Sequence, residues 1–392
     1  MNEDPVLPAY GAGGLAGVLG AVAARLLPDD DVVARTALPS ATGQPVTSQV
    51  EIPVARRYVV VLVDGLGWYP LQNALADAPY LAGIFGDGYR LTSTVPSTTA
   101  TAITSFTTGA APGEHGMVGY RFRWAANRGM NALTWDGGPT SAEQSKIAEF
   151  SLVKTWFQRL AAAGVSVYDI ARGKFADSGL TRVAFAGAEF VVEAHGAPRA
   201  DQVAEISRSG ETNLTYVYER ALDHTGHPYG LNTPQWRQAL IRTDAYLERL
   251  RATLDADTVL LVTGDHGMVD VGSQSRVVIE DESRLGCHLN MVEGEARFRH
   301  LYTDHPREVA ARWAAFLGSR AWVCRCEEAM ELGWFGTVST AVRHRIGDVV
   351  VALRDDWAVL TRSWPGEMRL VGMHGSLTPA EMCIPLLIDK GD

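Results

Sequence analysis

Carboxylate and imidazole side chains directly follow the two most apolar runs of this chain. Asp64 comes after Tyr58–Val63, and the pair Asp265 and His266 comes after Thr258–Thr263, in both cases next to glycine. Runs of this kind are typical of strands buried in a parallel sheet, and ligands collect at the carboxyl ends of such strands. Asp64 alone is explained equally well as a turn residue. An imidazole adds nothing specific to a turn, so the second loop indicates a binding or catalytic site.

A second pair of an acid and a histidine stands four residues apart at Asp223 and His227. This spacing would put both side chains on one face of a helix. Gly226 and Pro228, however, favour a loop after the expected strand Leu214–Tyr218, from which both side chains can converge on one ion. His224 competes for the same role, and the spacing does not decide between the two histidines.

Hydroxyl side chains gather in Pro96–Ala102, before a helix expected to continue through Ile103–Thr108. Hydroxyls at the start of a helix normally cap it. The same position also places a hydroxyl beside free backbone N–H groups and the positive end of the helix dipole, which suits an anionic substrate. Near the C-terminus, His374 lies in the sequence Gly-Met-His-Gly, which fits an ordinary turn as well as a ligand loop.

The elements that must position these residues alternate between strands and helices. This alternation predicts an α/β fold with a central, mostly parallel sheet and helices on both faces. Beyond the two apolar runs, strands are expected at Leu91–Val95, Val165–Ile170, Val183–Ala186, Leu214–Tyr218 and Ile384–Ile388, and helices at Leu15–Leu27, Ser141–Ala163, Val203–Ser207 and Pro234–Leu254.

The sequence pattern changes between about Gly286 and Ser363. Short strands are expected there around one helix, at Arg297–Thr303, Ala321–Arg325, Asp348–Leu353 and, for the helix, Pro306–Leu317. We therefore expect a smaller inserted α+β subdomain at residues 286–363 and a catalytic α/β core formed by residues 1–285 and 364–392.

Composition excludes several classes of protein. The 392 residues carry a formal net charge of −10, so no overall basic field attracts a nucleic-acid backbone. Four cysteines are too few for a disulfide scaffold. Glu3 and Asp4 stand where a signal peptide would be basic, and no run reaches the roughly 20 apolar residues that span a bilayer. A cytoplasmic protein without a membrane segment is expected.

The order of these motifs along the chain resembles the alkaline phosphatase superfamily. An acid after the first strand, Pro-Ser-x-Thr, Asp-x-x-x-His, Asp-His-Gly and a late His-Gly follow one another from Tyr58 to the C-terminus. Within that superfamily the chain looks most similar to type I phosphodiesterases and nucleotide pyrophosphatases. Thr108–Gly116 and Gly372–Met382 are also similar to stretches of that branch.

The resemblance implies a hydrolase with two zinc ions that cleaves a small phosphodiester or a nucleotide pyrophosphate through a covalent phosphothreonine intermediate. It implies Thr99 as the nucleophile, with Thr98 as the rival. Manganese or iron could occupy the same oxygen and nitrogen donors. The implied metal ligands are Asp64, Thr99, Asp265 and His266 for the ion next to the nucleophile, and Asp223, His227 and His374 for the second ion.

Other functions on the same scaffold remain alternatives. A phosphomonoesterase or a phosphonate hydrolase would use the same residue types, whereas a sulfatase would need Cys or Ser as the source of its nucleophile. A non-catalytic binding protein is the alternative from another class. It has no physical need to gather so many carboxylates and imidazoles in one place. The oligomeric state is left open.

Overall fold

A seven-stranded sheet forms the larger part of the protein. The computed structural model describes residues 4–10, 13–27, 50–139, 150, 153–196 and 198–391. The strand order is β2-β17-β8-β1-β7-β5-β6, and only β17 runs antiparallel to its neighbours. The strands span Arg57–Val63 (β1), Tyr89–Thr92 (β2), Ser166–Ala171 (β5), Glu189–Val192 (β6), Asn213–Glu219 (β7), Thr258–Gly264 (β8) and Cys383–Asp389 (β17).

The register of the three central strands fixes where the functional loops begin. Val63 at the end of β1 is level with Glu219 of β7 on one side and with Gly264 of β8 on the other. The three strands are parallel, so the residues that follow them leave the sheet at the same end, where the strands have their carboxyl termini. Asp64 and Asp265 therefore start neighbouring loops.

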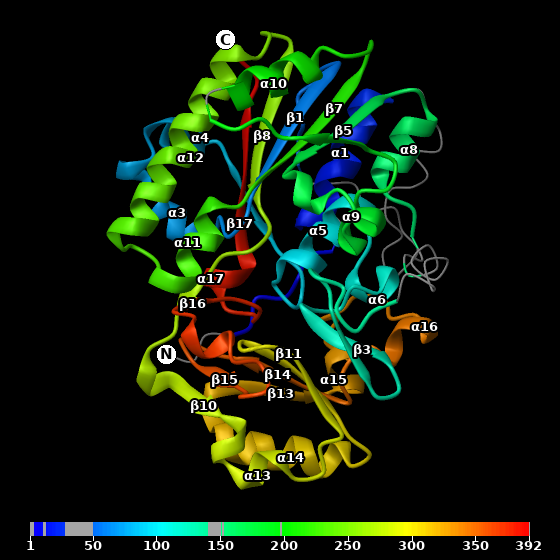
Figure 1. Cartoon of the computed structure of the whole chain (residues 1–392), viewed down its shortest axis with the longest axis vertical. Helices are drawn as coiled ribbons and strands as arrows, with labels where there is room; N and C mark the ends of the chain where they lie inside the picture. The colour runs from blue at the N-terminus through cyan, green and yellow to red at the C-terminus, as the bar shows by residue number, and fades with distance from the viewer. Residues whose placement is uncertain are drawn as a thin grey trace.

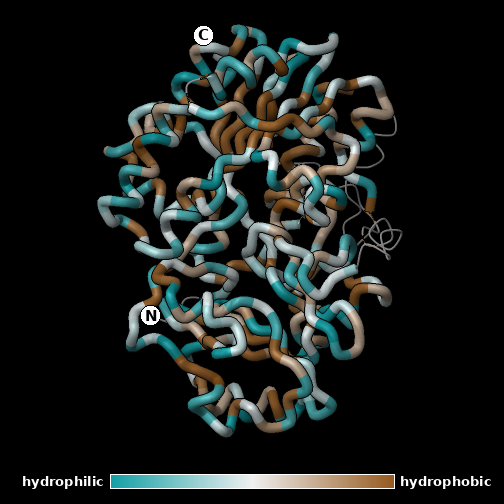
Figure 2. The backbone as a smooth tube through the Cα atoms, in the orientation of Figure 1, coloured by the Kyte–Doolittle hydropathy of each residue, from teal (hydrophilic) through white to brown (hydrophobic). Residues whose placement is uncertain are grey.

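Helices cover both faces of this sheet (Figure 1). The alternating side chains of β1 divide between two apolar cores, with Val60 and Leu62 in one and Val59 and Val61 in the other. Figure 2 shows the sheet strands as the most hydrophobic part of the backbone. The first core packs against α1 (Val18–Leu26), α5 (Thr99–Thr108), α8 (Trp156–Ala162) and α9 (Gly179–Ala184), and the second against α3 (Trp68–Gln72), α4 (Pro79–Phe85), α10 (Pro198–Ser207) and α12 (Pro234–Thr253).

A second, four-stranded antiparallel sheet lies below the first in Figure 1. Its order is β11-β12-β14-β13, and α14 covers it through the buried side chains Val309, Trp313 and Leu317. The helix has the bounds expected from its sequence pattern. The elements of this region are α13 (Ser283–Gly286), β11 (Met291–Glu295), β12 (Phe298–Tyr302), α14 (Pro306–Leu317), β13 (Ala321–Arg325), α15 (Cys326–Glu331), α16 (Thr340–Arg343) and β14 (Val349–Leu353).

Three small two-stranded sheets and two short helices connect the larger parts. The strand pairs are β3 (Arg121–Ala125) with β4 (Arg128–Asn131), β9 (Val269–Asp270) with β16 (Gly372–Met373), and β10 (Arg276–Val278) with β15 (Ala358–Leu360). The helices are α6 (Pro112–His115) and α17 (Pro379–Met382).

Two expected elements differ from the structure. The strand expected at Val183–Ala186 is wrong, because these residues end helix α9, whose N-cap Ser178 accepts a hydrogen bond from the Thr181 backbone N–H. The helix expected at Ser141–Ala163 is wrong at residues 153–155, which are described and not helical, because Thr155 is the extended N-cap of α8. Residues 141–149 and 151–152 lie outside the described residues.

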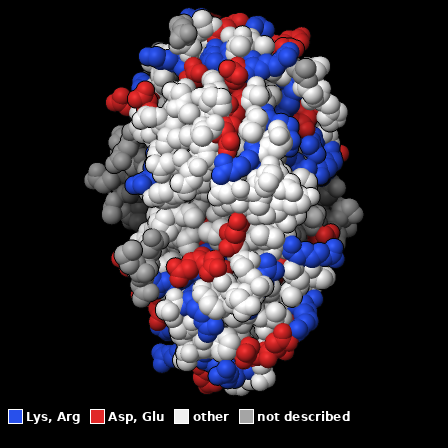
Figure 3. Space-filling model, turned by 90° about the vertical axis from the view of Figure 1, so that its left-hand side faces the viewer, with Lys and Arg blue, Asp and Glu red and all other residues white. Residues whose placement is uncertain are grey.

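Charged side chains of both signs alternate over the face shown in Figure 3 and form no single basic patch there. Within the described ranges, none of the helices combines the length and the apolar character needed to cross a membrane.

Candidate metal centre

Four of the expected ligand residues meet beside the start of α5. The Nε2 atom of His266 lies 3.5 Å from Asp64 Oδ1, 3.5 Å from Asp265 Oδ2 and 3.2 Å from the hydroxyl oxygen of Thr99. Asp265 and His266 are fully buried, and Asp64 and Thr99 are nearly so. One carboxylate oxygen from each acid, one imidazole nitrogen and one hydroxyl thus face a common point.

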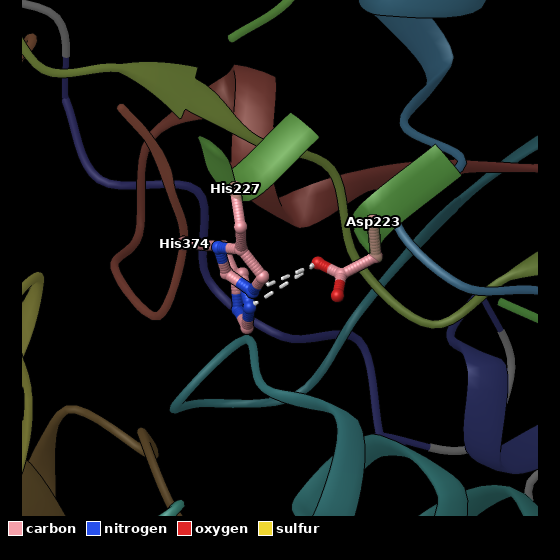
Figure 4. A group of neighbouring side chains, drawn as sticks. All are labelled: Asp223, His227 and His374. Carbon is pink, nitrogen blue, oxygen red and sulfur yellow. Dashed lines mark ion pairs between the residues drawn. The ribbon is translucent and has the colours of Figure 1, made fainter. Parts of the chain in front are cut away.

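The other three expected residues form a second group (Figure 4). Asp223 Oδ1 lies 3.3 Å from Nε2 of His227 and 3.6 Å from Nε2 of His374. Asp223 and His227 extend from one helix, and His374 follows β16. The two groups adjoin, because ligand atoms of Asp64, Asp223 and His266 also lie within 4.8 Å of one another.

The helix that carries Asp223 and His227 corrects a sequence expectation. We expected a loop there, but α11 runs from Ala221 to Tyr229. Pro228 is tolerated because it lies in the last turn, where it removes little of the hydrogen-bond ladder before Gly230 ends the helix with φ +83°. His224, the competing histidine, lines the neighbouring cavity but belongs to neither group of ligand atoms.

Each imidazole is oriented by a backbone carbonyl. The Nδ1 atom of His227 is 2.9 Å from the Gly372 oxygen, that of His266 is 2.9 Å from the Gly267 oxygen, and that of His374 is 3.0 Å from the Ser97 oxygen. A carbonyl only accepts, so each Nδ1 carries a proton, which leaves Nε2 as the ring nitrogen that faces the ligand atoms of the site. The sequence gives no sign of these partners.

Two of the three aspartates are half satisfied by hydrogen bonds from the protein. Tyr218 donates its hydroxyl proton to Asp64 Oδ2, and Asp265 Oδ1 accepts from the backbone N–H groups of Gly65 and His266 at 3.0 Å. The atoms that face the site, Asp64 Oδ1, Asp223 Oδ1 and Asp265 Oδ2, have no hydrogen-bond donor. Buried carboxylate oxygens without donors are costly unless a cation pairs with them. The donor set therefore fits two divalent cations of the zinc type.

The charges of this centre are strongly coupled. Burial, reinforced by Asp223 and Asp265, raises the pKa of Asp64 well above its ordinary value. Burial would also raise the pKa of Asp223, but the attraction of His227 and then His374 outweighs it, so this pKa is lowered. Burial and the neighbouring His266 lower the pKa of His374, which favours its neutral form. Neutral imidazole is the form that binds metals.

Close contact between glycines brings the two loops together. A Cβ atom on Gly67 would lie 2.7 Å from the Cα atom of Gly267 and 3.1 Å from the carbonyl oxygen of Ala380. Gly67 and Gly267 therefore allow the loop after β1 to pack against the loop after β8 with their backbones in direct contact.

The two candidate nucleophiles are placed differently. Thr99 is the first residue of α5 and directs its hydroxyl toward His266. Thr98 is its N-cap residue, and its side chain makes no capping bond. The hydroxyl in contact with a ligand atom is thus that of Thr99.

A cavity of about 620 Å³ opens beside the centre. Asp64, Thr99, Asp223, His227 and His374 all line it. Apolar and aromatic side chains make up much of its wall, and the charged residues around it include Asp169, Lys174, Arg220 and Glu295. Its size is that of a small-molecule site. Among the described residues, one further group of potential ligands lies on the surface, formed by His288, His305 and Glu308.

Comparison with known protein families identifies the family of this chain. Residues 58–377 match the family of type I phosphodiesterases and nucleotide pyrophosphatases. The chain belongs to this family. The superfamily resemblance inferred from the motifs is thereby confirmed, and the mostly parallel sheet predicted from the alternation of strands and helices is confirmed as well.

Curated relatives match over shorter stretches. GPI ethanolamine phosphate transferase 2 of Kluyveromyces lactis is 23% identical over 236 residues, which are 56% of this chain and 27% of that protein. The catalytic subunit of human GPI ethanolamine phosphate transferase 3 is 36% identical over 64 residues, or 16% and 6% of the two chains. The aligned part thus covers about a quarter or less of these relatives.

Solved structures match over most of the chain. Murine ectonucleotide pyrophosphatase/phosphodiesterase 5 superposes with a TM-score of 0.67 at 19% identity, covering 84% of this chain and 87% of that one. Phosphonoacetate hydrolase of Sinorhizobium meliloti 1021, in complex with phosphonoformate, gives a TM-score of 0.64 at 18% identity, covering 88% and 92%. At these identities the likeness establishes a shared fold.

Proposed function

We propose that this protein is a metal-dependent hydrolase of small phosphodiesters or nucleotide pyrophosphates. The observation that carries the proposal is the set of three donor-free carboxylate oxygens facing three imidazole Nε2 atoms next to Thr99. Family membership supports the reaction type. An inactive threonine-to-alanine variant of the murine relative was solved with AMP, which supports a nucleotide-sized ligand.

Asp64, Thr99, Asp265 and His266 would hold one cation, and Asp223, His227 and His374 the other. Such cations, when bound, would favour the alkoxide form of Thr99 and offset the negative charge of the phosphoryl oxygens. Zinc suits these ligands, and manganese or iron would also be accepted. The carbonyls of Ser97, Gly267 and Gly372 keep the three imidazoles in place for this task.

Thr99 Oγ1 would attack phosphorus in line with the leaving oxygen. The new bond joins Thr99 to phosphorus while the bond to the leaving oxygen breaks, the threonine proton passes to solvent and the leaving group takes up a proton. Water then hydrolyses the phosphothreonine and frees Thr99. The location of Thr99 at the N-terminus of α5 supports this role, because the free N–H groups there favour the negative charge of the phosphoryl group.

The same test also distinguishes two other reactions from diester hydrolysis. Phosphonoacetate hydrolase shares the fold, and the curated relatives are transferases, in which an alcohol would replace water in the second step. Turnover of bis(4-nitrophenyl) phosphate, 4-nitrophenyl phosphate and phosphonoacetate by the zinc-loaded protein separates the hydrolases. Formation of a new ester when ethanolamine is added identifies a transferase. Failure to turn over any diester would contradict the proposal.

A further inference from the structure

An arginine of β3 lines the cavity beside the metal centre. Arg121 and Trp364 both belong to the wall of this cavity, together with Thr99. The Arg121 guanidinium lies over the Trp364 ring, 4.6 Å from the ring centroid, and its Nε donates to Oε2 of Glu293 at 2.9 Å. Glu293 is a buried residue of β11. A contact to the face of the guanidinium group and a contact to its Nε atom thus fix the position of this cation.

The two terminal nitrogens of Arg121 remain available. Nη1 and Nη2 form no hydrogen bond with any residue that the structure describes, and the side chain is 20% exposed where it borders the cavity. Stacking on Trp364 uses the face of the guanidinium group, so the N–H bonds in its plane stay free to donate. A charged, forked pair of donors is the arrangement that binds the oxygens of a phosphate or a carboxylate.

Two nearby arginines show how a guanidinium group with a structural role is bound in this region. Arg297 uses Nε, Nη1 and Nη2 for Glu381 and for backbone carbonyls. Arg299 likewise uses all three nitrogens, for Glu367 and for one backbone carbonyl. Both side chains are fully buried. Arg121 differs from both, because among the described residues only its Nε atom has an acceptor.

The location of Arg121 separates it from the reacting phosphoryl group. Its partner Glu293 stands two residues before Glu295 on β11, which is about 7 Å along a strand. Glu295 is the residue that meets the ligand loop after β16, because a Cβ atom on Gly375 would lie 2.6 Å from its Cγ atom. Arg121 therefore reaches a part of the substrate that lies beyond the phosphoryl group at Thr99.

We propose that Arg121 determines substrate specificity by binding a second anionic group of the substrate, a phosphate or a carboxylate, through Nη1 and Nη2. The inference rests on the proposed function and narrows its substrate class to diesters that carry a further negative charge. The cavity of about 620 Å³ has room for such a group next to the phosphoryl group. Because a guanidinium stays protonated throughout the working range of pH, its contribution does not depend on titration.

The test uses three diesters that share the 4-nitrophenyl leaving group and differ in the second alcohol. These are ethyl, 3-carboxypropyl and 3-phosphopropyl 4-nitrophenyl phosphate. The zinc-loaded parent protein should prefer at least one of the two charged diesters over the ethyl diester in kcat/KM. Arg121→Met should lower kcat/KM for the preferred diester by ~10- to 10²-fold, mainly through KM, and should change the value for the ethyl diester by less than ~3-fold. The preferred diester shows whether the second group is a carboxylate or a phosphate.

Arg123→Met is the matched control. Arg123 stands two residues further on β3, lies over the Tyr302 ring and donates Nε to the carbonyl of His344, but it is not part of the cavity wall. It should leave the preference of the parent unchanged. Arg121→Lys keeps the charge without the fork and should retain part of the preference. If Arg121→Met alone is unstable, adding Glu293→Gln removes the unpaired carboxylate, and the ratio between two substrates is independent of the folded fraction.

A parent without preference for either charged diester would overturn the inference. The same holds if Arg121→Met lowers kcat/KM equally for the ethyl and the charged diesters, because Arg121 would then act on the phosphoryl group or on the fold. If the parent hydrolyses none of the diesters, the proposed function fails. Calorimetric titration with the same three compounds then tests the inference alone, and equal affinities of the parent and Arg121→Met for both charged diesters refute it.

Discussion

The imidazole rings of His266 and His374 lie parallel, with 3.6 Å between their centroids and 13° between their planes. Each ring belongs to a different group of ligand atoms, so this stacking joins the two halves of the candidate metal centre. Two protonated rings at this separation would repel each other strongly. The pair is therefore suited to neutral imidazoles that direct Nε2 toward cations.

Removal of the cations should abolish turnover. We expect a chelator to eliminate diesterase activity and to lower the melting temperature, and zinc to restore both, because the unpaired carboxylate oxygens destabilise the metal-free fold.

His374→Ala should retain about one ion fewer than the parent protein in metal analysis. The control is His224→Ala, which removes a histidine of the cavity wall that belongs to neither ligand group. Unchanged metal content in His374→Ala would contradict this assignment.

The two threonines should differ sharply in their effect on turnover. Thr99→Ala should lower kcat by ~10³-fold or more, because it removes the attacking oxygen. Thr99→Ser should recover part of the activity. Thr98→Ala should have a far smaller effect, since it is the Thr99 hydroxyl that contacts the ligand atom of His266. Full activity of Thr99→Ala together with loss of activity in Thr98→Ala would reverse the two roles.

Stability should depend on pH through Asp169, a buried residue of β5. Burial raises its pKa from 3.8 to about 7. The unfolded chain releases this proton near pH 4 and the folded chain only near pH 7, so the free energy of unfolding falls as pH rises through that window. Asp169→Asn carries no such proton. In urea denaturation it should gain ~2–4 kcal/mol relative to the parent between pH 4.5 and pH 8.

The comparison for this experiment is Asp177→Asn, whose side chain is 95% exposed. The pH dependence of the stability difference for Asp169→Asn is compared with that for this variant. If the two do not differ, the Asp169 carboxyl titrates normally in the folded protein.

Sequence reasoning found the residues that stand directly after long apolar strands. Asp265 and His266 were recognisable because an imidazole after a buried strand adds nothing specific to a turn, whereas Asp64 alone fitted a turn residue equally well. The groups that orient the imidazoles were not recognisable, because they are backbone carbonyl groups, which every residue carries.

Short helices were the weak point of the fold prediction. Gly226 and Pro228 argued locally against a helix, yet packing of Leu222 into the second core stabilises α11. The strand expected at Val183–Ala186 rested on residues that favour strands, whereas the cap at Ser178 and the burial of Leu180 fix a helix. Tertiary contacts outweigh local preference in both cases.

Arg297, between β11 and β12 of the second sheet, and Glu381 of α17 form a buried ion pair. Both side chains are fully buried, and the guanidinium donates to both carboxylate oxygens, at 3.1 and 2.6 Å. The carbonyl of Glu381 accepts from the N–H of Gly267, beside His266. Arg297→Met should cost ~3–5 kcal/mol in urea unfolding, because it leaves a buried carboxylate without its cation.

The double variant Arg297→Met, Glu381→Leu separates the charge effect from packing. It should regain part of the lost stability, since it removes the unpaired carboxylate along with the arginine. Glu381 also accepts from the Ser376 backbone N–H and from the Thr378 hydroxyl, so recovery should be incomplete. If the double variant were less stable than Arg297→Met by the full cost of a second independent substitution, the two side chains would not be coupled, and the ion pair would not be what joins the second sheet to the loop of His266.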